Sequence, residues 1–245
     1  MKEERFFYQS NIEAGELTKE DTQHAVRVLR MAAGDEMWLM DGCGTFYRAR
    51  ITAASNHRCA YSIEERLPQS PAWQGHIHLA VAPTKLNDRI EWLAEKATEI
   101  GLNELSFLDC QYSERHVLKI ERIDKIVVSA MKQSRKAWKP VVNDMFRFRA
   151  FIEQERVGQK FICHCYEEED VQIQMAGDKP FLLDVLKPGE DATVLIGPEG
   201  DFSIGEVRMA MTNGWRSVSL GRSRLRTETA ALVAVHLMQI RNQNL

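Results

Sequence analysis

The sequence predicts an α/β protein of two domains: a small β-rich domain over residues 1–70 and a larger α/β domain with a mostly parallel sheet over residues 71–245. Three observations lead to this prediction. Strand-like runs dominate residues 1–66, the segment 67–75 carries two prolines and a glycine as linkers do, and strand-like and helix-like segments alternate after it. The 245 residues, 44% of them apolar, can bury cores of this size.

In the first domain, residues 22–31 suit a short helix that ends near Gly34. Two strand-like runs, 37–40 and 45–51, flank the segment Asp41-Gly42-Cys43-Gly44. Two glycines between two strands are typical of a hairpin turn, because glycine accepts a positive φ. No helix opens after these glycines, so a turn is favoured over a phosphate-binding loop.

In the second domain, alternating strands and helices predict a largely parallel sheet. The helix over 88–100 places its apolar residues on one face and ends at Gly101, and Ser203-Ile204-Gly205-Glu206 predicts a capping box. Strands are expected at 76–82, 105–108, 160–165, 193–196 and 217–220, and helices at 88–100, 123–131, 203–214 and 227–240.

The charge is unevenly distributed although the net charge is only −3. Residues 112–149 hold ten Lys/Arg against four acids, whereas residues 153–191 hold ten acids against four Lys/Arg. The first segment indicates a surface that faces a polyanion; a solvated helical face is the alternative.

The cysteines and the apolar runs predict a cytoplasmic protein with reduced thiols and no membrane partner. The five cysteines form no Cys-x-x-Cys pair, and no apolar run approaches the roughly 20 residues of a membrane span. Cys163-His164-Cys165 resembles a metal cluster, but alternating side chains on a strand point to opposite faces and no second ligand pair follows. We therefore predict no metal.

Two loops at strand ends are the candidates for chemistry, because ligands bind at the carboxyl ends of strands in an open parallel sheet. The first is Gly197-Pro198-Glu199-Gly200, whose glycines let the backbone approach a ligand closely. It matches neither a Walker loop nor Gly-x-Gly-x-x-Gly, which disfavours a nucleoside triphosphate or a Rossmann-held dinucleotide. A plain strand-to-helix turn is the alternative.

The second loop runs from Leu220 to Ala230 and carries arginines at 222, 224 and 226 before a Thr-Glu-Thr step into an apolar helix. Crowding three guanidinium groups at a strand end is costly unless an anion is expected there. In the alternative, Glu228 only complements the helix dipole and Arg226 is its surface partner.

Together the two loops resemble the RsmE family, enzymes of the SPOUT superfamily that methylate N3 of a uridine in 16S ribosomal RNA. The resemblance extends over essentially the whole chain. Its other matching segments are His24, 28–31, 34–35 and 41–42 in a PUA-like domain, and 96–101, 113–115, 133–134, Pro140 and His164 beyond it.

The resemblance implies a PUA-like β-barrel over 1–70, a deep trefoil knot in the C-terminal domain and a homodimer whose active site is completed across the interface. It also implies S-adenosylmethionine as cofactor and the small ribosomal subunit as partner. By this resemblance the cofactor-binding residues are His164, Leu195, Gly197, Pro198, Glu199, Gly200, Leu220, Gly221, Leu225, Thr227 and Thr229. The RNA-binding residues are Arg5, His24, Arg27, Arg30, Lys85, Arg89, Arg115, Arg135 and Lys136.

The chain departs from the family pattern at a few positions. A usual glycine is Asp201, an arginine of the last motif is Ser223, and another expected arginine is Lys136. The spacing between Lys85 and Arg89 differs by one residue from the common one. These changes affect the expected phosphate contacts more than the methyl transfer.

The expected reaction needs two kinds of group. Uridine N3 attacks well only as its anion, so a base or a cation that stabilises charge on O2 and O4 is required. Glu228 is the candidate base and Arg226 the candidate for holding the charge; structural roles for both stay open. Two other classes of function also stay open: a non-catalytic ribosome- or RNA-binding factor on the same fold, and a small-molecule α/β enzyme.

Overall fold

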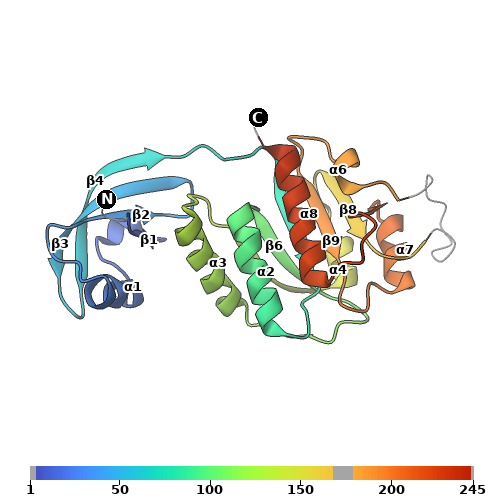
Figure 1. Ribbon diagram of the computed structural model, residues 1–245, viewed down its shortest axis with the longest axis horizontal. Helices are drawn as coiled ribbons and strands as arrows, with labels where there is room; N and C mark the ends of the chain where they lie inside the picture. The colour runs from blue at the N-terminus through green and yellow to red at the C-terminus, as the bar shows by residue number, and fades with distance from the viewer. Residues whose placement is uncertain (1–3, 168–178, 244–245) are drawn as a thin grey trace. The chain divides into compact units, whose positions relative to one another are not determined.

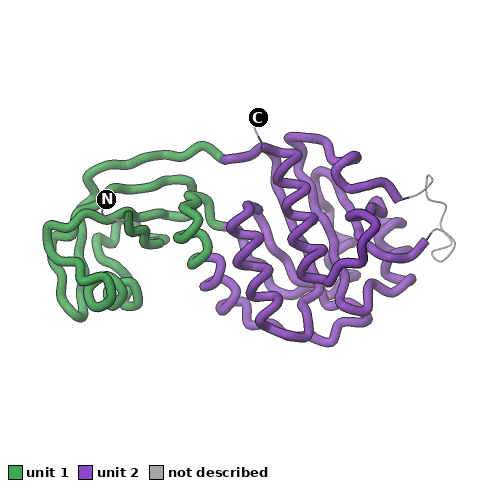
Figure 2. The backbone as a smooth tube through the Cα atoms, viewed as in Figure 1, with its two compact units in different colours: residues 1–71, 128–139 green, residues 72–127, 140–245 purple. Residues whose placement is uncertain are grey.

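The computed structural model describes residues 4–167 and 179–243. The chain forms two compact units, residues 1–71 with 128–139 and residues 72–127 with 140–245 (Figure 2). The second unit therefore contains the predicted α/β domain, while the last part of one of its helices clusters with the first unit.

The first unit contains a four-stranded sheet in the order β1-β2-β3-β4 (Figure 1). Strand β1 pairs parallel to β2, and the other neighbours are antiparallel. The elements are β1 (Phe6–Tyr8), a short turn of helix (Ile12–Ala14), α1 (Lys19–Gln23), a π-helical turn (His24–Val28), β2 (Glu36–Met40), β3 (Thr45–Ala54) and β4 (Cys59–Pro68). Their inner faces bury a core that includes Phe7, Met37, Leu39, Ala49 and Ile51.

The predicted hairpin turn is confirmed. One carboxylate oxygen of Asp41 accepts hydrogen bonds from the N–H groups of Cys43 and Thr45, at 2.7 and 3.0 Å, and Gly42 and Gly44 have positive φ. The predicted helix over 22–31 instead covers 19–28, because the Thr18 hydroxyl caps it from the front. The predicted linker over 67–75 starts two residues too early, since β4 runs to Pro68.

The second unit is built on a six-stranded, entirely parallel sheet in the order β10-β8-β9-β5-β6-β7. The strands are β5 (Ile77–Val81), β6 (Glu104–Asp109), β7 (Val141–Arg147), β8 (Gln159–Cys163), β9 (Ala192–Ile196) and β10 (Arg216–Val218). The helices are α2 (Asn87–Ile100), α3 (Ile120–Ser134), α4 (Phe148–Ile152), α6 (Leu182–Val185), α7 (Ile204–Thr212) and α8 (Thr227–Asn242). The predicted strands and helices are present with ends moved by a few residues, and β7, α4 and α6 are additional.

Helices cover both faces of this sheet, which is why its central strands β5 and β9 are buried at every position (Figure 1). Alternate strand residues such as Leu79, Phe107 and Val194 pack against α2, α3 and α8. The intervening residues, among them Ala80 and Leu195, pack against α4 and α7. No helix in the described part of the chain combines the length and apolar character needed to span a bilayer.

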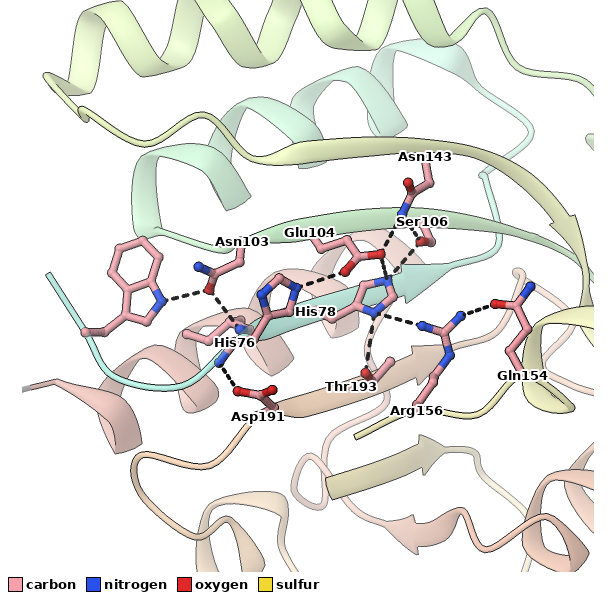
Figure 3. A network of polar contacts seen from close by, with 12 residues as sticks. His76, His78, Asn103, Glu104, Ser106, Asn143, Gln154, Arg156, Asp191 and Thr193 are labelled. Carbon is pink, nitrogen blue, oxygen red and sulfur yellow. Dashed lines mark hydrogen bonds and ion pairs between the residues drawn. The ribbon is translucent and has the colours of Figure 1, made fainter. Parts of the chain in front are cut away.

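Polar side chains form a network at the amino-terminal edge of the parallel sheet (Figure 3). The buried His78 ring lies 2.8 Å from the Ser106 hydroxyl through Nε2 and 3.4 Å from the Thr193 hydroxyl through Nδ1. Glu104 accepts hydrogen bonds from His76, at 2.8 Å, and from Asn143, at 2.6 Å. Burial lowers the pKa of His78 to about 4, while the hydrogen bond from His76 is the main cause that lowers the pKa of Glu104 to about 2.

The neutral, buried His78 should make folding stability fall in mild acid. Below an ordinary histidine pKa of about 6.5 the unfolded chain takes up a proton that the folded chain refuses down to about pH 4. The contribution of His78 to the free energy of unfolding is complete above pH 6.5. It decreases by about 3 kcal/mol as the pH falls from 6.5 to 4. His78→Gln should reduce this slope in urea unfolding between pH 4.5 and 7.5 and leave the part that comes from His164, whose pKa burial also lowers to about 4. The exposed-site control His57→Gln should keep the parent slope, and an unchanged slope in His78→Gln would refute this origin.

Candidate active site

Five loops meet at one edge of the six-stranded sheet, because its strands all run parallel and each loop follows the carboxyl end of a strand. They cover residues 82–86 after β5, 110–119 after β6, 164–167 after β8, 197–203 after β9 and 219–226 after β10. Both loops singled out from the sequence are among them. The structure therefore brings the two motifs to the same edge of the sheet.

The two glycines of the β9 loop, Gly197 and Gly200, differ in how much room their surroundings leave for a side chain. A Cβ at Gly197 would lie 2.9 Å from the backbone nitrogen of Phe202, so the loop itself requires glycine there. A Cβ at Gly200 would lie 3.4 Å from the Cβ of Tyr112, which is ordinary van der Waals contact. The described part of the fold therefore does not demand glycine at position 200.

Asp201 has a left-handed backbone, with φ of 67°. This explains how it replaces a usual glycine of the family pattern, since aspartate tolerates this region when its side chain bonds locally. Its carboxylate accepts hydrogen bonds from the N–H groups of Cys165, at 2.8 Å, and Phe202, at 2.7 Å. Asp201 thus ties the loop after β9 to the loop after β8.

Two more carboxylates tie the neighbouring loops together. Glu199 accepts a hydrogen bond from the N–H of Lys85 at 2.9 Å, which joins the loops after β9 and β5. Glu206 completes the predicted capping box of α7 and also accepts the N–H of Gln111 at 2.8 Å. The predicted cofactor residue Glu199 therefore already has a role within the protein.

The start of α8 holds the two predicted catalytic residues in different surroundings. Arg226 is the exposed N-cap, and its side chain makes no capping hydrogen bond. Glu228 is only 7% exposed, and its Oε1 lies 3.5 Å from a guanidinium nitrogen of Arg89 on α2. Its Oε2 is buried without a hydrogen-bond partner in the described residues. The cation paired with Glu228 is thus Arg89, which corrects the interpretation of Arg226 as its partner.

His164, at the end of β8, is buried beside β10. Its Nε2 lies 2.8 Å from the hydroxyl of Ser217, and its Nδ1 is buried without a partner among the described residues. Burial, followed by the charge of Lys179, lowers the pKa of His164 to about 4. The ring is therefore neutral and presents one unused nitrogen.

The other predicted cofactor residues differ in accessibility. Leu195 is completely buried in the core against α4 and α7, so its side chain serves packing. Those nearest the surface are the half-buried Leu220, Leu225 and Thr229 and the exposed Gly221, whereas Pro198 and Thr227 are buried.

Predicted RNA-binding residues of the first unit gather around its first strand. Arg5 donates a hydrogen bond to the carbonyl of Leu29 at 2.8 Å, next to Arg30. Arg135 pairs with Glu4, the neighbour of Arg5, at 2.8 Å. Arg30 and Arg135 both have left-handed backbones, with φ of 54° and 53°, which is strained for arginine. The remaining members are the exposed His24 and Arg27 and the half-buried Lys136, whose pKa burial lowers.

The predicted RNA-binding residues of the second unit are engaged by protein groups. Lys85 pairs with Glu114 at 2.6 Å on the surface. Arg115 donates to the carbonyl groups of Thr84, at 3.1 Å, and of Lys85. Arg89 pairs with Glu228 as described above, a contact that spacing could not reveal because it depends on the packing of α2 against α8.

Within residues 4–167 and 179–243, no group of three or more His, Cys, Asp or Glu side chains could hold a metal ion. The five cysteines are free, with Cys43 and Cys165 exposed.

Known proteins match both parts of the chain. A PUA domain of RNA methyltransferases matches residues 17–63, and an RNA methyltransferase domain matches residues 71–239. The ribosomal RNA small subunit methyltransferase E of Rickettsia conorii is 25% identical over 96% of this chain and 94% of its own, and that of Synechocystis is 29% identical over 89% and 70%.

Solved structures agree with these matches. A "probable rRNA-methyltransferase" from Porphyromonas gingivalis is 39% identical, with a TM-score of 0.87 over 96% of this chain and 98% of its own. A methyltransferase from Legionella pneumophila in complex with the cofactor SAM is 25% identical, with a TM-score of 0.87 over 99% and 100%.

A parallel sheet with its motif loops at one edge, preceded by a PUA domain, defines an RNA methyltransferase. The chain belongs to the RsmE family of these enzymes.

Substitutions at Asp201 should separate backbone strain from side-chain bonding. Asp201→Ala keeps the unfavourable φ and loses both hydrogen bonds, whereas Asp201→Gly loses the bonds but relieves the strain. We expect Ala to lower the free energy of unfolding by about 1 kcal/mol more than Gly, and Asn, which keeps an acceptor and tolerates this backbone, to be the mildest. Chemical denaturation measures the order; equal losses for Ala and Gly would contradict it.

Proposed function

We propose that this chain transfers a methyl group from S-adenosylmethionine to N3 of a uridine in 16S ribosomal RNA of the small ribosomal subunit. The names of the relatives and the SAM-bound Legionella structure support the substrate and the cofactor. The observation that carries the proposal is the meeting of both motif loops at one sheet edge, in a chain with RNA methyltransferase and PUA domains.

The residues of the sheet edge suit this cofactor. The open position at Gly200, the exposed Gly221 and the unused Nδ1 of His164 leave backbone and one polar atom available to a ligand. We assign the holding of its methionine and adenine parts to the loops 197–200 and 220–229. When bound, S-adenosylmethionine supplies an already activated sulfonium methyl group, so the protein mainly has to align the nucleophile.

Glu228 and Arg226 are assigned the two roles that uridine N3 requires. The Oε2 of Glu228 has no donor among the described residues, and the N3–H group of the base would supply one. Arg89 holds the other carboxylate oxygen and so orients Glu228. The exposed guanidinium of Arg226, two residues away, would hold the negative charge that develops on the uracil oxygens.

We propose that RNA is held by both parts of the chain, a PUA-like barrel domain over residues 1–70 and a methyltransferase domain over 71–245. The cluster of Arg5, Arg30 and Arg135 supports phosphate contacts, and the strained backbones of Arg30 and Arg135 support a functional origin. His24, Arg27, Lys136, Lys85, Arg89 and Arg115 complete the proposed RNA-binding set.

We also propose a homodimer, a trefoil knot and a cytoplasmic location. An apolar stripe on the adjoining helices α2 and α8 supports an interface: Trp92 and Ile240 are 42% and 40% exposed, and Leu232 and Val233 are half-buried. The path of the chain supports a knot, because β9 is inserted between β8 and β5 while α8, which follows the edge strand β10, returns to pack on α2 and β5.

Methylation of purified substrates tests the proposal. Small ribosomal subunits and free 16S RNA from cells that lack the gene should accept labelled methyl groups from S-adenosylmethionine, and nuclease digestion should yield N3-methyluridine. Binding of both ligands without transfer would instead favour a non-catalytic ribosome-binding factor.

Gly200→Ala should weaken cofactor binding without harming the fold. The added Cβ makes only ordinary contact with Tyr112, so the melting temperature should stay near that of the parent, while a ligand against the backbone loses its space. Gly205→Ala, five residues away in α7, is the matched control because its Cβ meets nothing closer than 4.0 Å. Calorimetry with S-adenosylmethionine should show a loss for Gly200→Ala alone; equal affinities would remove Gly200 from the site.

Arg226→Ala should lower kcat by about 10²–10³ with little change in cofactor affinity, as expected for a donor that acts on charge formed in the transition state. Arg226→Lys should recover part of the loss, because an ammonium group cannot reproduce a planar fork at two oxygens. Raising the pH should partly rescue the Ala variant, since solvent then deprotonates more uridine.

The neighbouring exposed Arg222 provides the control, because Arg222→Ala removes the same charge from the same loop. Single-turnover methylation at saturating RNA should leave Arg222→Ala near the parent rate. An undiminished saturated rate in Arg226→Ala would end its catalytic assignment.

A further inference from the structure

A groove of about 510 Å³ opens in the second unit where the loop after β6 enters α3. Its volume lies within the range of small-ligand sites. The lining residues are Leu118, Lys119, Ile120, Glu121, Arg122, Lys125 and Asp144. Leu118 and Ile120 also pack partly against the main core, so the groove combines apolar surface with charged groups.

The loop that leads into this groove begins at the candidate active site. The N–H of Gln111 is bound by Glu206, and the Cβ of Tyr112 would be 3.4 Å from a Cβ at Gly200. Further along the same loop, Tyr112 is 48% exposed and Val117 is 77% exposed. An aromatic ring and an apolar side chain are therefore open to solvent between the β9 loop and the groove.

The charges of the groove fit a nucleotide better than a simple anion. Lys119 and Lys125 are exposed and make no ion pair with any described residue, whereas Arg122 is fixed by Glu91 of α2 at 2.5 Å. Lysines suit phosphate groups. The two carboxylates of the lining can accept the N–H donors that unpaired bases present, as carboxylates do in base recognition.

We propose that the loop 111–119 and this groove bind the single-stranded RNA that flanks the methylated uridine. Tyr112 stacks on a base beside the β9 loop, Lys119 and Lys125 bind phosphates, and Glu121 and Asp144 contact the edge of a base. The inference rests on the proposed function, because it needs RNA at the sheet edge, and it adds residues that the family resemblance did not indicate.

Binding of a short single-stranded RNA that contains the target, measured against salt in the full chain, tests the inference. Loss of both lysines in Lys119→Ala/Lys125→Ala should reduce the slope of log affinity against log salt by about 1.4, at about 0.7 per contact. Tyr112→Ala should weaken RNA binding by about fivefold to a hundredfold, and Tyr112→Phe, which keeps the aromatic ring, should bind RNA like the parent. Lys187→Ala, at the opposite edge of the sheet, is the matched lysine control and should keep the parent slope.

Cofactor calorimetry distinguishes these effects from damage to the fold, since each variant should bind S-adenosylmethionine like the parent. Suppose that the parent binds and methylates RNA, but the lysine variant has the parent's salt slope and Tyr112→Ala has the parent's RNA affinity. The proposed RNA path along the loop 111–119 is then overturned, and the proposed function stands. If the parent itself neither binds nor methylates RNA, the proposed function fails first.

Discussion

The parallel direction of all six strands in the second unit is the constraint on which the site depends. It sends every loop that follows a strand to one edge, and carboxylates then join these loops: Glu199 to the β5 loop, Asp201 to the β8 loop and Glu206 to the β6 loop. The opposite edge carries the hydrogen-bonded network around His78 (Figure 3). We propose that the loop edge, with the exposed Gly221 and the unpaired side-chain atoms of His164 and Glu228, is the edge that binds ligands.

Left-handed backbone at non-glycine residues marks the β9 loop and the basic cluster of the first unit. Within the described residues, the non-glycine residues with positive φ are Arg30, Arg135 and Asp201. Asp201 offsets its strain with one hydrogen bond in the β9 loop and one to the β8 loop, while the two arginines lie in the basic cluster of the first unit. Strain of this kind costs about 1–3 kcal/mol per residue and persists where the surroundings or a ligand require it.

Local features of the fold could be predicted from the sequence, and long-range features could not. The turn at Asp41, the capping box at Ser203 and the apolar face of α2 depend on neighbours in the chain. The sequence pattern does not predict β7, because β7 lies at the sheet edge and its residues do not alternate between buried and exposed. The pairing of Arg89 with Glu228 depends on how α2 packs on α8, and the insertion of β9 between β8 and β5 depends on the whole sheet. The family resemblance located the motif loops. The structure was needed to show that the loop requires glycine at position 197 but not at position 200, and that the Leu195 side chain lies in the core.

Mass spectrometry of nucleosides from 16S ribosomal RNA tests the central claim most directly. RNA from the parent cells and from cells that lack the gene is digested and compared, with a third sample from deletion cells that carry the gene again. The account predicts that N3-methyluridine is lost on deletion and returns with the restored gene. An unchanged amount of N3-methyluridine in the deletion cells, or the loss of a different methylated nucleoside, would contradict it.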